Sequence, residues 1–311
     1  MSGSTANPTD GGLDIVVQMV GILATCLAGI IGLILLQTPT AKAQSSFFPN
    51  ASSEPSKHFY ETFVLHYSAV WMGIFGVVVI TQAYELFSPI MYILFFVFLC
   101  LPFVLQPLIY PGPADGARPW HQRYATKANV WIAVYSFIGN YWYTHYFYSV
   151  LKAAYTLPGA IRLNNVPICM FLATHAYFSS YHLLSNCLLR KVVTTFERTI
   201  QRDVLFVAVI GVLAYFTAFM ETFTISSFPY YVFEDRNMAY VVGSAFYGIY
   251  FIVSFPAFYF FDNQIDQANP TVTIWDTIVQ SCGYGMIILI LLDLTRLLVD
   301  VPLVVGATAI P

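Results

Sequence analysis

The sequence predicts an all-α integral membrane protein, a polytopic helical bundle of about 8 transmembrane helices. Of its 311 residues, 58% are hydrophobic and only 9% are charged, whereas an ordinary soluble domain carries about 25% charged residues. Mean hydropathy is correspondingly high, at +0.68. The apolar residues are also gathered into eight runs of about 20 residues, which is the length that a helix needs to cross a bilayer.

The eight runs extend from near the N-terminus to near the C-terminus, roughly at 13–36, 60–83, 89–109, 128–150, 166–188, 204–226, 238–260 and 274–298. Polar segments between them are no longer than about two dozen residues, and no repeat of fixed period is visible. We therefore expect one membrane domain over 55–311, preceded by an N-terminal extension, 1–54, that carries one additional helix.

The first run has two interpretations. Ala41-Lys42-Ala43, which follows it, resembles a signal-peptidase site. However, no Lys or Arg precedes the apolar stretch, and the stretch is longer than a usual signal peptide. We expect the helix to be retained. Asn50-Ala51-Ser52 is a glycosylation sequon, and its modification would indicate cleavage, because the sequon would then face the lumen.

Positive residues between the runs predict the orientation, since Lys and Arg stay on the cytoplasmic side. One side, side A, carries nine of them: Lys42, Lys57, Arg118, Arg123, Lys127, Arg190, Lys191, Arg198 and Arg202. The opposite side, side B, carries three: Lys152, Arg162 and Arg236. Side A is therefore predicted to be cytoplasmic, and both termini to be lumenal or extracellular.

Ionisable residues within the predicted helices are the strongest functional signal, because such a group is costly in a bilayer unless it meets a partner or a cavity. Five of them lie toward side B, each in or at the end of a different run: Glu85, His145, His175, Glu221 and Asp293. We therefore predict a proton-handling cavity that opens toward side B.

Each of these residues also has a structural interpretation. Asp293 and Arg296 are three residues apart and can pair within one helix. Glu85 lies near the predicted interface and can be solvated, and His145 can be a hydrogen-bonded interface histidine. For Glu221 the structural interpretation is weakest, because its run contains no neighbouring cation.

The fourth and fifth runs carry further patterns. Nine of the nineteen residues from Val130 to Tyr148 are aromatic, and an interfacial belt explains only those near the helix end. Aromatic rings suit a flat polycyclic lipid and can stabilise a cation, with ring packing between helices as the alternative. In the fifth run His175, Ser179, His182 and Asn186 share one helical face, which is also typical of a polar seam between helices.

Other features exclude some classes of function. A formal charge of -3 gives no basic footprint for nucleic acid. Five cysteines lie singly in apolar runs, without the spacing of a metal site. The segment 228–236, after the sixth run, could form a lid over the side B mouth or anchor the bundle at the lipid headgroups.

Several stretches resemble cycloeucalenol cycloisomerase, the family of cyclopropylsterol isomerases. The resemblance runs from about residue 55 to 298, and its most specific parts are Phe228-Pro229-Tyr230-Tyr231 and Tyr250-Phe251-Ile252-Val253-Ser254-Phe255-Pro256. Other matching stretches are Lys127-Ala128-Asn129, Gly139-Asn140-Tyr141, Thr144-His145-Tyr146-Phe147, Thr174-His175, Tyr181-His182 and Glu221-Thr222. The first run, the basic loop 189–203 and the C-terminal tail depart from the family's pattern.

The resemblance implies a sterol isomerase of the endoplasmic reticulum that opens the 9β,19-cyclopropane ring of a 4α-methyl sterol, as in cycloeucalenol to obtusifoliol. An acid protonates C19, cationic character develops near C9, and a base removes the proton at C8. The reaction is redox-neutral and requires no metal, nucleotide or flavin, so no cofactor is expected. The expected partners are the sterol substrate and membrane lipid.

Roles for individual residues follow from this chemistry. Desolvation favours the neutral form of a buried carboxyl, so Glu221 is the expected acid. His145 or His175 is the expected base or proton relay, and Glu85 and Asp293 are further catalytic candidates. The candidates for contact with the sterol and its cation are Trp142, Tyr146, Tyr230 and Tyr231. The candidates for binding the 3β-hydroxyl are Asn140 and Asp235.

Two alternatives remain open. A Δ8–Δ7 sterol double-bond isomerase would use the same acid and base, because it also protonates and deprotonates neighbouring sterol carbons. A sterol-binding protein or proton-coupled carrier would also contain intramembrane His and Glu residues. Carriers usually show internal repeats and broken helices at the midplane. Here Pro102 and Pro256 interrupt predicted helices, but no two halves of the sequence correspond.

Overall fold

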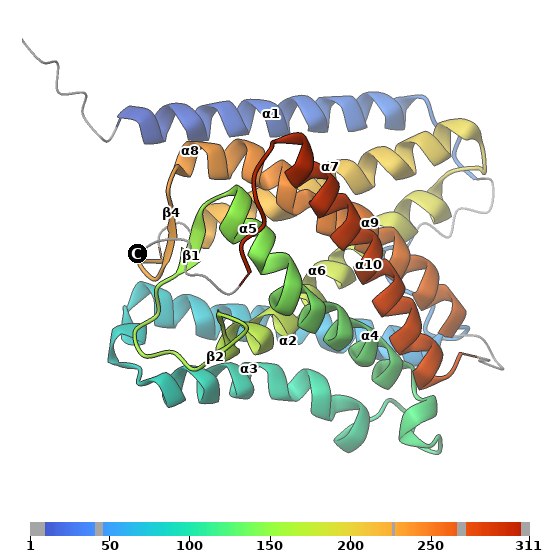
Figure 1. Ribbon diagram of the computed structural model, residues 1–311. Helices are drawn as coiled ribbons and strands as arrows, with labels where there is room; N and C mark the ends of the chain where they lie inside the picture. Colours follow the sequence, from blue (N-terminus) through green and yellow to red (C-terminus); the bar gives the residue numbers. More distant parts are fainter. Residues whose placement is uncertain (1–9, 41–45, 226–227, 266–271, 306–311) are drawn as a thin grey trace, which may run out of the picture.

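The computed structural model describes residues 10–40, 46–225, 228–265 and 272–305, and the all-α membrane bundle is confirmed (Figure 1). Helices cover all eight predicted runs. Their bounds are α1 Asp10–Leu35, α2 Pro55–Ile80, α3 Pro89–Ile109, α4 Tyr124–Ile138, α5 Thr144–Val150, α6 Ile168–Thr195, α7 Ile200–Ile225, α8 Arg236–Met238, α9 Ser244–Ile265 and α10 Ile274–Leu298. Two short 3₁₀ turns, η1 Ala83–Leu86 and η2 Trp120–Gln122, precede α3 and α4.

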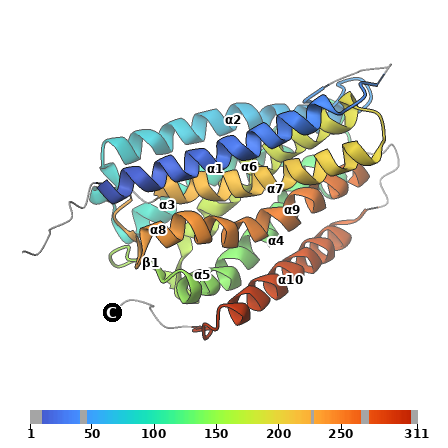
Figure 2. The same cartoon turned by 90° about the horizontal axis from the view of Figure 1, so that it is seen from above.

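Within the described residues, six helices are long and apolar enough to cross a membrane: α1, α2, α3, α7, the helix that ends with α9, and α10. The other two predicted runs correspond to the α4–α5 helix and to α6. Helix α6 lies inside the bundle and contacts α2, α3, α4, α7 and α9 (Figure 2). A helix surrounded by protein needs no apolar surface, which accounts for the polar residues of α6.

Two helices contain a π-helical turn in the side B half of the bundle. These turns are η3 Gly139–Tyr143, between α4 and α5, and η4 Ala239–Gly243, between α8 and α9. A π turn inserts an extra residue into the helix and is frequent at functional sites. The backbone N–H of Thr144 donates to the carbonyl oxygen of Gly139 across η3, and the Thr144 hydroxyl adds a second hydrogen bond to the same oxygen at 3.3 Å.

Two small antiparallel sheets lie at the side B end. Strand β1 Ala153–Tyr155 pairs with β4 Tyr231–Phe233, and β2 Arg162–Leu163 pairs with β3 Val166–Pro167 (Figure 1). The first sheet connects the segment after α5 with the segment after α7. The hairpin between β2 and β3 turns at Asn164 and Asn165, whose φ angles are 50° and 61°, a conformation that Asn tolerates.

Helix α1 lies alongside α7 on the outside of the bundle (Figure 2). It buries Met19, whose Sδ accepts a hydrogen bond from the Tyr215 hydroxyl at 3.7 Å. At its end, the Gln37 amide donates to the carbonyl oxygen of Gln201 at 3.2 Å. The described part of the extension therefore contributes to the packing, and retention of 1–54 in the mature chain stays a prediction.

Candidate active site

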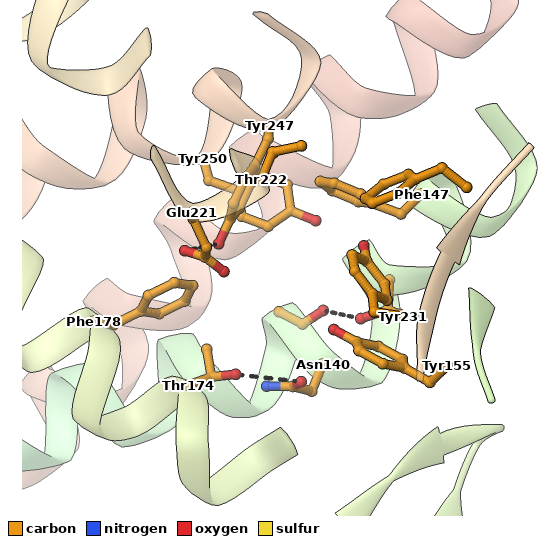
Figure 3. Close-up of a pocket in the computed structure, with 13 residues that line it drawn as sticks. Asn140, Phe147, Tyr155, Thr174, Phe178, Glu221, Thr222, Tyr231, Tyr247 and Tyr250 are labelled. Carbon is orange, nitrogen blue, oxygen red and sulfur yellow. Dashed lines mark hydrogen bonds between the residues drawn. The ribbon is translucent and has the colours of Figure 1, made fainter. Parts of the chain in front are cut away.

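A cavity lies in the side B half of the bundle and is lined from the α4–α5 helix, α6, α7, α9 and the β1–β4 sheet (Figure 3). Its volume is about 70 Å³, which is room for a few water molecules. Thirteen residues line it, and seven of these are Phe or Tyr. The cavity is therefore a small aromatic chamber rather than an open channel.

Glu221 is the only acidic residue among those thirteen, and no Lys, Arg or His is among them. Its carboxyl points into the cavity from α7 (Figure 3). The hydroxyl of Tyr247, on α9, donates to its Oε2 at 2.8 Å, and the hydroxyl of Tyr181, on α6, interacts with the same carboxyl. Among the side chains that the structure describes, no cation pairs with Glu221.

Tyr247 is held rigidly beside Glu221. Its ring meets the rings of Phe147 and Tyr250 edge-on, with centroids 5.2 and 4.8 Å away, and packs at a tilt on the ring of Phe251 at 5.1 Å. Such offset and edge-on ring pairs are the favourable geometries. The hydroxyl that contacts the carboxyl is thus fixed by packing on three sides.

The β1–β4 sheet closes the cavity opposite Phe178 (Figure 3). Tyr155 and Tyr231 stack with their ring centroids 4.6 Å apart and an interplanar angle of 28°. Burial raises the pKa of both hydroxyls above the ordinary tyrosine value, so both phenols stay protonated near neutral pH. Ring faces around a chamber of this kind stabilise a positive charge within it.

A polar patch lies on another wall, around the π turn η3. Asn140 donates through Nδ2 to the carbonyl oxygen of Ser136 at 2.9 Å, and its Oδ1 accepts from the hydroxyl of Thr174 at 3.4 Å (Figure 3). Thr144 and Thr222 add two further hydroxyls to the lining. The cavity therefore combines one carboxyl, aromatic faces and a few neutral polar groups.

The two histidines predicted as base or relay do not line this cavity. His145 is fully buried on another face of α5, where its ring meets that of Tyr148 at 5.7 Å. The Nε2 atom of His175 lies 3.2 Å from Oδ1 of Asn129. The polar stripe continues along α6 to His182, whose Nε2 lies 3.0 Å from the hydroxyl of Ser254, as expected for a seam between helices.

The other two acidic candidates also lie elsewhere. Glu85 is exposed in η1. Asp293 pairs with Arg296 at 2.8 Å, as in the structural interpretation, and accepts a hydrogen bond from the Tyr146 hydroxyl at 3.4 Å. The five ionisable residues therefore share the side B half of the bundle but do not converge on one cavity, because only Glu221 faces it.

Of the predicted sterol-contacting residues, Asn140 and Tyr231 line the cavity. Trp142 is 42% exposed, and Tyr230 packs on Phe228 and Tyr84 outside the lining. Asp235 caps α8, accepting from the backbone N–H groups of residues 237 and 238. The side chain of Arg236 lies outside the described residues.

A second buried polar cluster, which we call the ion cluster, lies at the side A end. It consists of Lys57, Glu61, Arg190 and Asp262. Arg190 binds both carboxylate oxygens of Glu61, at 2.6 and 2.8 Å, and Asp262 pairs with Lys57 and accepts a hydrogen bond from Tyr124. Every charge in this cluster has an opposite charge beside it.

The sequence interpretation did not single out Tyr247, Thr174 or the ion cluster. A signal for Tyr247 is present, since four of the six residues from Phe246 to Phe251 are aromatic, as in the fourth run. Lys57 and Arg190 were interpreted only as loop residues of side A. Their partners are 205 and 129 positions away in the sequence, at Asp262 and Glu61. No local sequence pattern indicates pairs between residues so far apart.

The fold and the site define a class: a polytopic helical membrane protein with a carboxyl group in an aromatic internal cavity. Within the described residues, no group of three or more His, Cys, Asp or Glu side chains is arranged to hold a metal ion. No model of a known protein family matches the chain, and no solved structure matches it.

A relative among curated proteins assigns the family. The cycloeucalenol cycloisomerase of Arabidopsis thaliana is 41% identical over 249 residues, which cover 78% of this chain and 86% of that protein. The chain therefore belongs to the cycloeucalenol cycloisomerase family and is an isomerase. The resemblance predicted from the motifs is confirmed.

Proposed function

We propose that the protein is a sterol isomerase that opens the 9β,19-cyclopropane ring of a 4α-methyl cyclopropyl sterol, converting cycloeucalenol to obtusifoliol, in the membrane of the endoplasmic reticulum. The family supports the substrate class, and the membrane bundle suits a substrate that dissolves in lipid. Residues 55–311 form the catalytic domain, and 1–54 add a retained helix.

Glu221 is the proton donor in this proposal. Its carboxyl is the only acid that faces the cavity within the described residues, and no cation holds it in the ionised form. Protonation of C19 breaks the C9–C19 bond and leaves positive charge near C9. The rings of Phe147, Phe178 and Tyr231 present the faces that stabilise such a charge.

The observation that carries the proposal is the combination of an acid without a cationic partner and an aromatic chamber around it. A purely structural carboxyl in a membrane helix is normally paired with a cation, as both carboxylates of the ion cluster are. A positioned general acid typically contributes about 10²- to 10⁴-fold in rate, and Glu221 is the residue placed to provide it.

The cavity of about 70 Å³ is smaller than the roughly 300–1,000 Å³ usual for small-molecule sites. A sterol must therefore widen it. The β1–β4 sheet is a short covering element, which pairs three residues on each strand and lies outside the helices of the bundle. In the proposal this sheet is the lid, with Tyr155 and Tyr231 on its inner side.

The test is conversion of a cyclopropyl sterol. Microsomes from a host that lacks this step, expressing the chain, are supplied with cycloeucalenol, and products are identified by mass spectrometry. We expect a Δ8 sterol with a new C19 methyl group. Unchanged cyclopropyl sterol with a well-expressed protein would overturn the proposal. In that case, conversion of a Δ8 sterol to a Δ7 sterol would indicate the double-bond isomerase, and sterol binding without conversion would indicate a carrier.

A further inference from the structure

We infer that Glu221 is the base as well as the acid, so that one carboxyl both delivers the proton to C19 and removes the proton from C8. This inference rests on the proposed function. It replaces the two-residue arrangement expected from the sequence, in which a histidine was the second group.

The lining of the cavity carries the inference. Of the thirteen residues there, Glu221 is the only one with a carboxyl or imidazole side chain, and none is Lys or Cys. The remaining polar groups are an amide, threonine hydroxyls and phenols. None of these is a base near neutral pH, because burial keeps the phenols of Tyr155 and Tyr231 protonated.

The former base candidates lie outside the cavity lining. His175 contacts Asn129, and the buried ring of His145 packs against Tyr148, with neither ring nitrogen hydrogen-bonded among the described residues. Asp293 is paired with Arg296. A base must reach the proton that it removes, at about 2.6–3.2 Å or through one water. The cavity holds only a few water molecules, and a sterol that fills it displaces them, so the carboxylate of Glu221 is the acceptor left beside the substrate.

Glu221 alone accounts for both proton transfers of the reaction. The carboxyl of Glu221 gives its proton to C19, and the electron pair of the C9–C19 bond forms the new C–H bond. Glu221 is then a carboxylate and C9 carries positive charge. The C8–H bond breaks, its electron pair forms the C8=C9 double bond, and the proton returns to Glu221. The enzyme ends in its starting state with no external donor or acceptor.

The hydroxyl groups around Glu221 suit this cycle. Between the two steps the carboxylate lies beside a carbocation, and hydrogen bonds from hydroxyls stabilise an anion without neutralising it permanently, as a Lys or Arg would. The Tyr247 hydroxyl at 2.8 Å and the nearby Tyr181 hydroxyl occupy these positions. Because one carboxyl faces one side of the substrate, both proton transfers take place on the same face of the sterol.

The number of ionising groups tests the inference. The sterol does not titrate, so the pH dependence of kcat/KM reports the free enzyme. With one group that must be protonated, kcat/KM is constant at low pH and falls on a single limb at high pH. A separate protein base must be deprotonated in the free enzyme, and it adds a second limb that falls at low pH.

The measurement uses the full-length wild-type protein in microsomes with a cyclopropyl sterol, together with His145→Gln, His175→Gln and Asp293→Asn. We expect one high-pH limb, and kcat/KM of all three variants within about threefold of wild type. A decrease of the wild-type kcat/KM at low pH would by itself overturn the inference. A 100-fold or larger loss of kcat/KM in one of the three variants, when that variant accumulates normally, would also overturn it. Absence of product from the wild type at every pH would instead contradict the proposed function.

Discussion

The Glu221 cavity and the ion cluster are both buried, polar and formed by helices distant in sequence. They differ in whether their carboxyl groups have cationic partners. In the ion cluster, Glu61 is bound at both oxygens by Arg190, and Asp262 is paired with Lys57. The space beside this cluster is about 10 Å³. Glu221 has hydroxyl partners only and borders a space of about 70 Å³.

This difference separates a structural role from a chemical one. A fully paired carboxylate beside so small a space has no free proton to give and no room for a substrate. It fixes α2, α6 and α9 relative to one another, because its partners come from these helices. A carboxyl without a cationic partner is costly to keep in a membrane protein. The cavity beside Glu221 indicates that this carboxyl is kept for a functional site rather than for stability.

The largest effect is expected for Glu221→Gln. The amide preserves the shape but has no acidic proton for C19, so turnover should fall by about 10²- to 10⁴-fold, while sterol binding and accumulation in the membrane persist. Product formation is measured by mass spectrometry and binding with a radiolabelled sterol. More than a few per cent of the wild-type rate would move the acid to another residue.

Glu61→Gln is the matched control at the other cluster. It leaves the charge of Arg190 buried with only Asp262 nearby, and breaking a buried pair in this way costs about 3–5 kcal/mol. We expect much less folded protein and a lower thermal aggregation temperature in detergent, with wild-type turnover per folded molecule. Combining it with Arg190→Met should restore part of the stability. A stable Glu61→Gln protein with 100-fold lower turnover would reverse the roles of the two clusters.

An intermediate effect is expected for Tyr247→Phe, which removes one hydroxyl and keeps the ring packing. A hydrogen bond to a charged group contributes about 1.5–3 kcal/mol, so kcat should fall by about 10- to 100-fold with little change in KM. Tyr215→Phe, which alters a hydroxyl on the outer side of α7, should leave kcat unchanged. Equal behaviour of the two variants would remove Tyr247 from the site.

The smallest effect is expected for Asp293→Asn. This residue was a catalytic candidate on sequence grounds, but its side chain is 37% exposed and paired within its own helix. Pairs of this kind contribute about 0–1 kcal/mol. Turnover within about threefold of wild type and a nearly unchanged aggregation temperature are expected. A strong loss of turnover in folded protein would show that the site extends to α10.

The sequence predicted the helices well because hydrophobic run length is a local property. The run 274–298 matches α10 Ile274–Leu298, and 89–109 matches α3 Pro89–Ile109. Glu221, the acidic residue of the cavity lining, was also singled out, since an intramembrane acid without a neighbouring cation is visible along a single helix; its catalytic role stays a prediction. The sequence did not predict the β1–β4 sheet or the π turns, which depend on contacts and helix geometry rather than on run length.

The prediction that the five ionisable side chains meet in one cavity was less accurate than the prediction of the helices. Distance from the helix end gave the correct half of the bundle for His145 and Asp293, but not the direction in which each side chain points. That direction depends on helix rotation and on partners such as Tyr148 and Arg296, which tertiary packing determines. The same limitation concealed Tyr247, whose importance comes from Glu221 on the neighbouring helix.

The most direct measurement is the fate of hydrogen at C19 when the wild-type enzyme acts on a cyclopropyl sterol in deuterated water. Glu221 borders a cavity with room for water, so its carboxyl proton exchanges with solvent between turnovers. Delivery of that proton predicts a product with a single deuterium, located in the C19 methyl group. A C19 methyl group without deuterium would contradict this account, because it would show that the donor of the C19 proton does not exchange with the water of the cavity between turnovers.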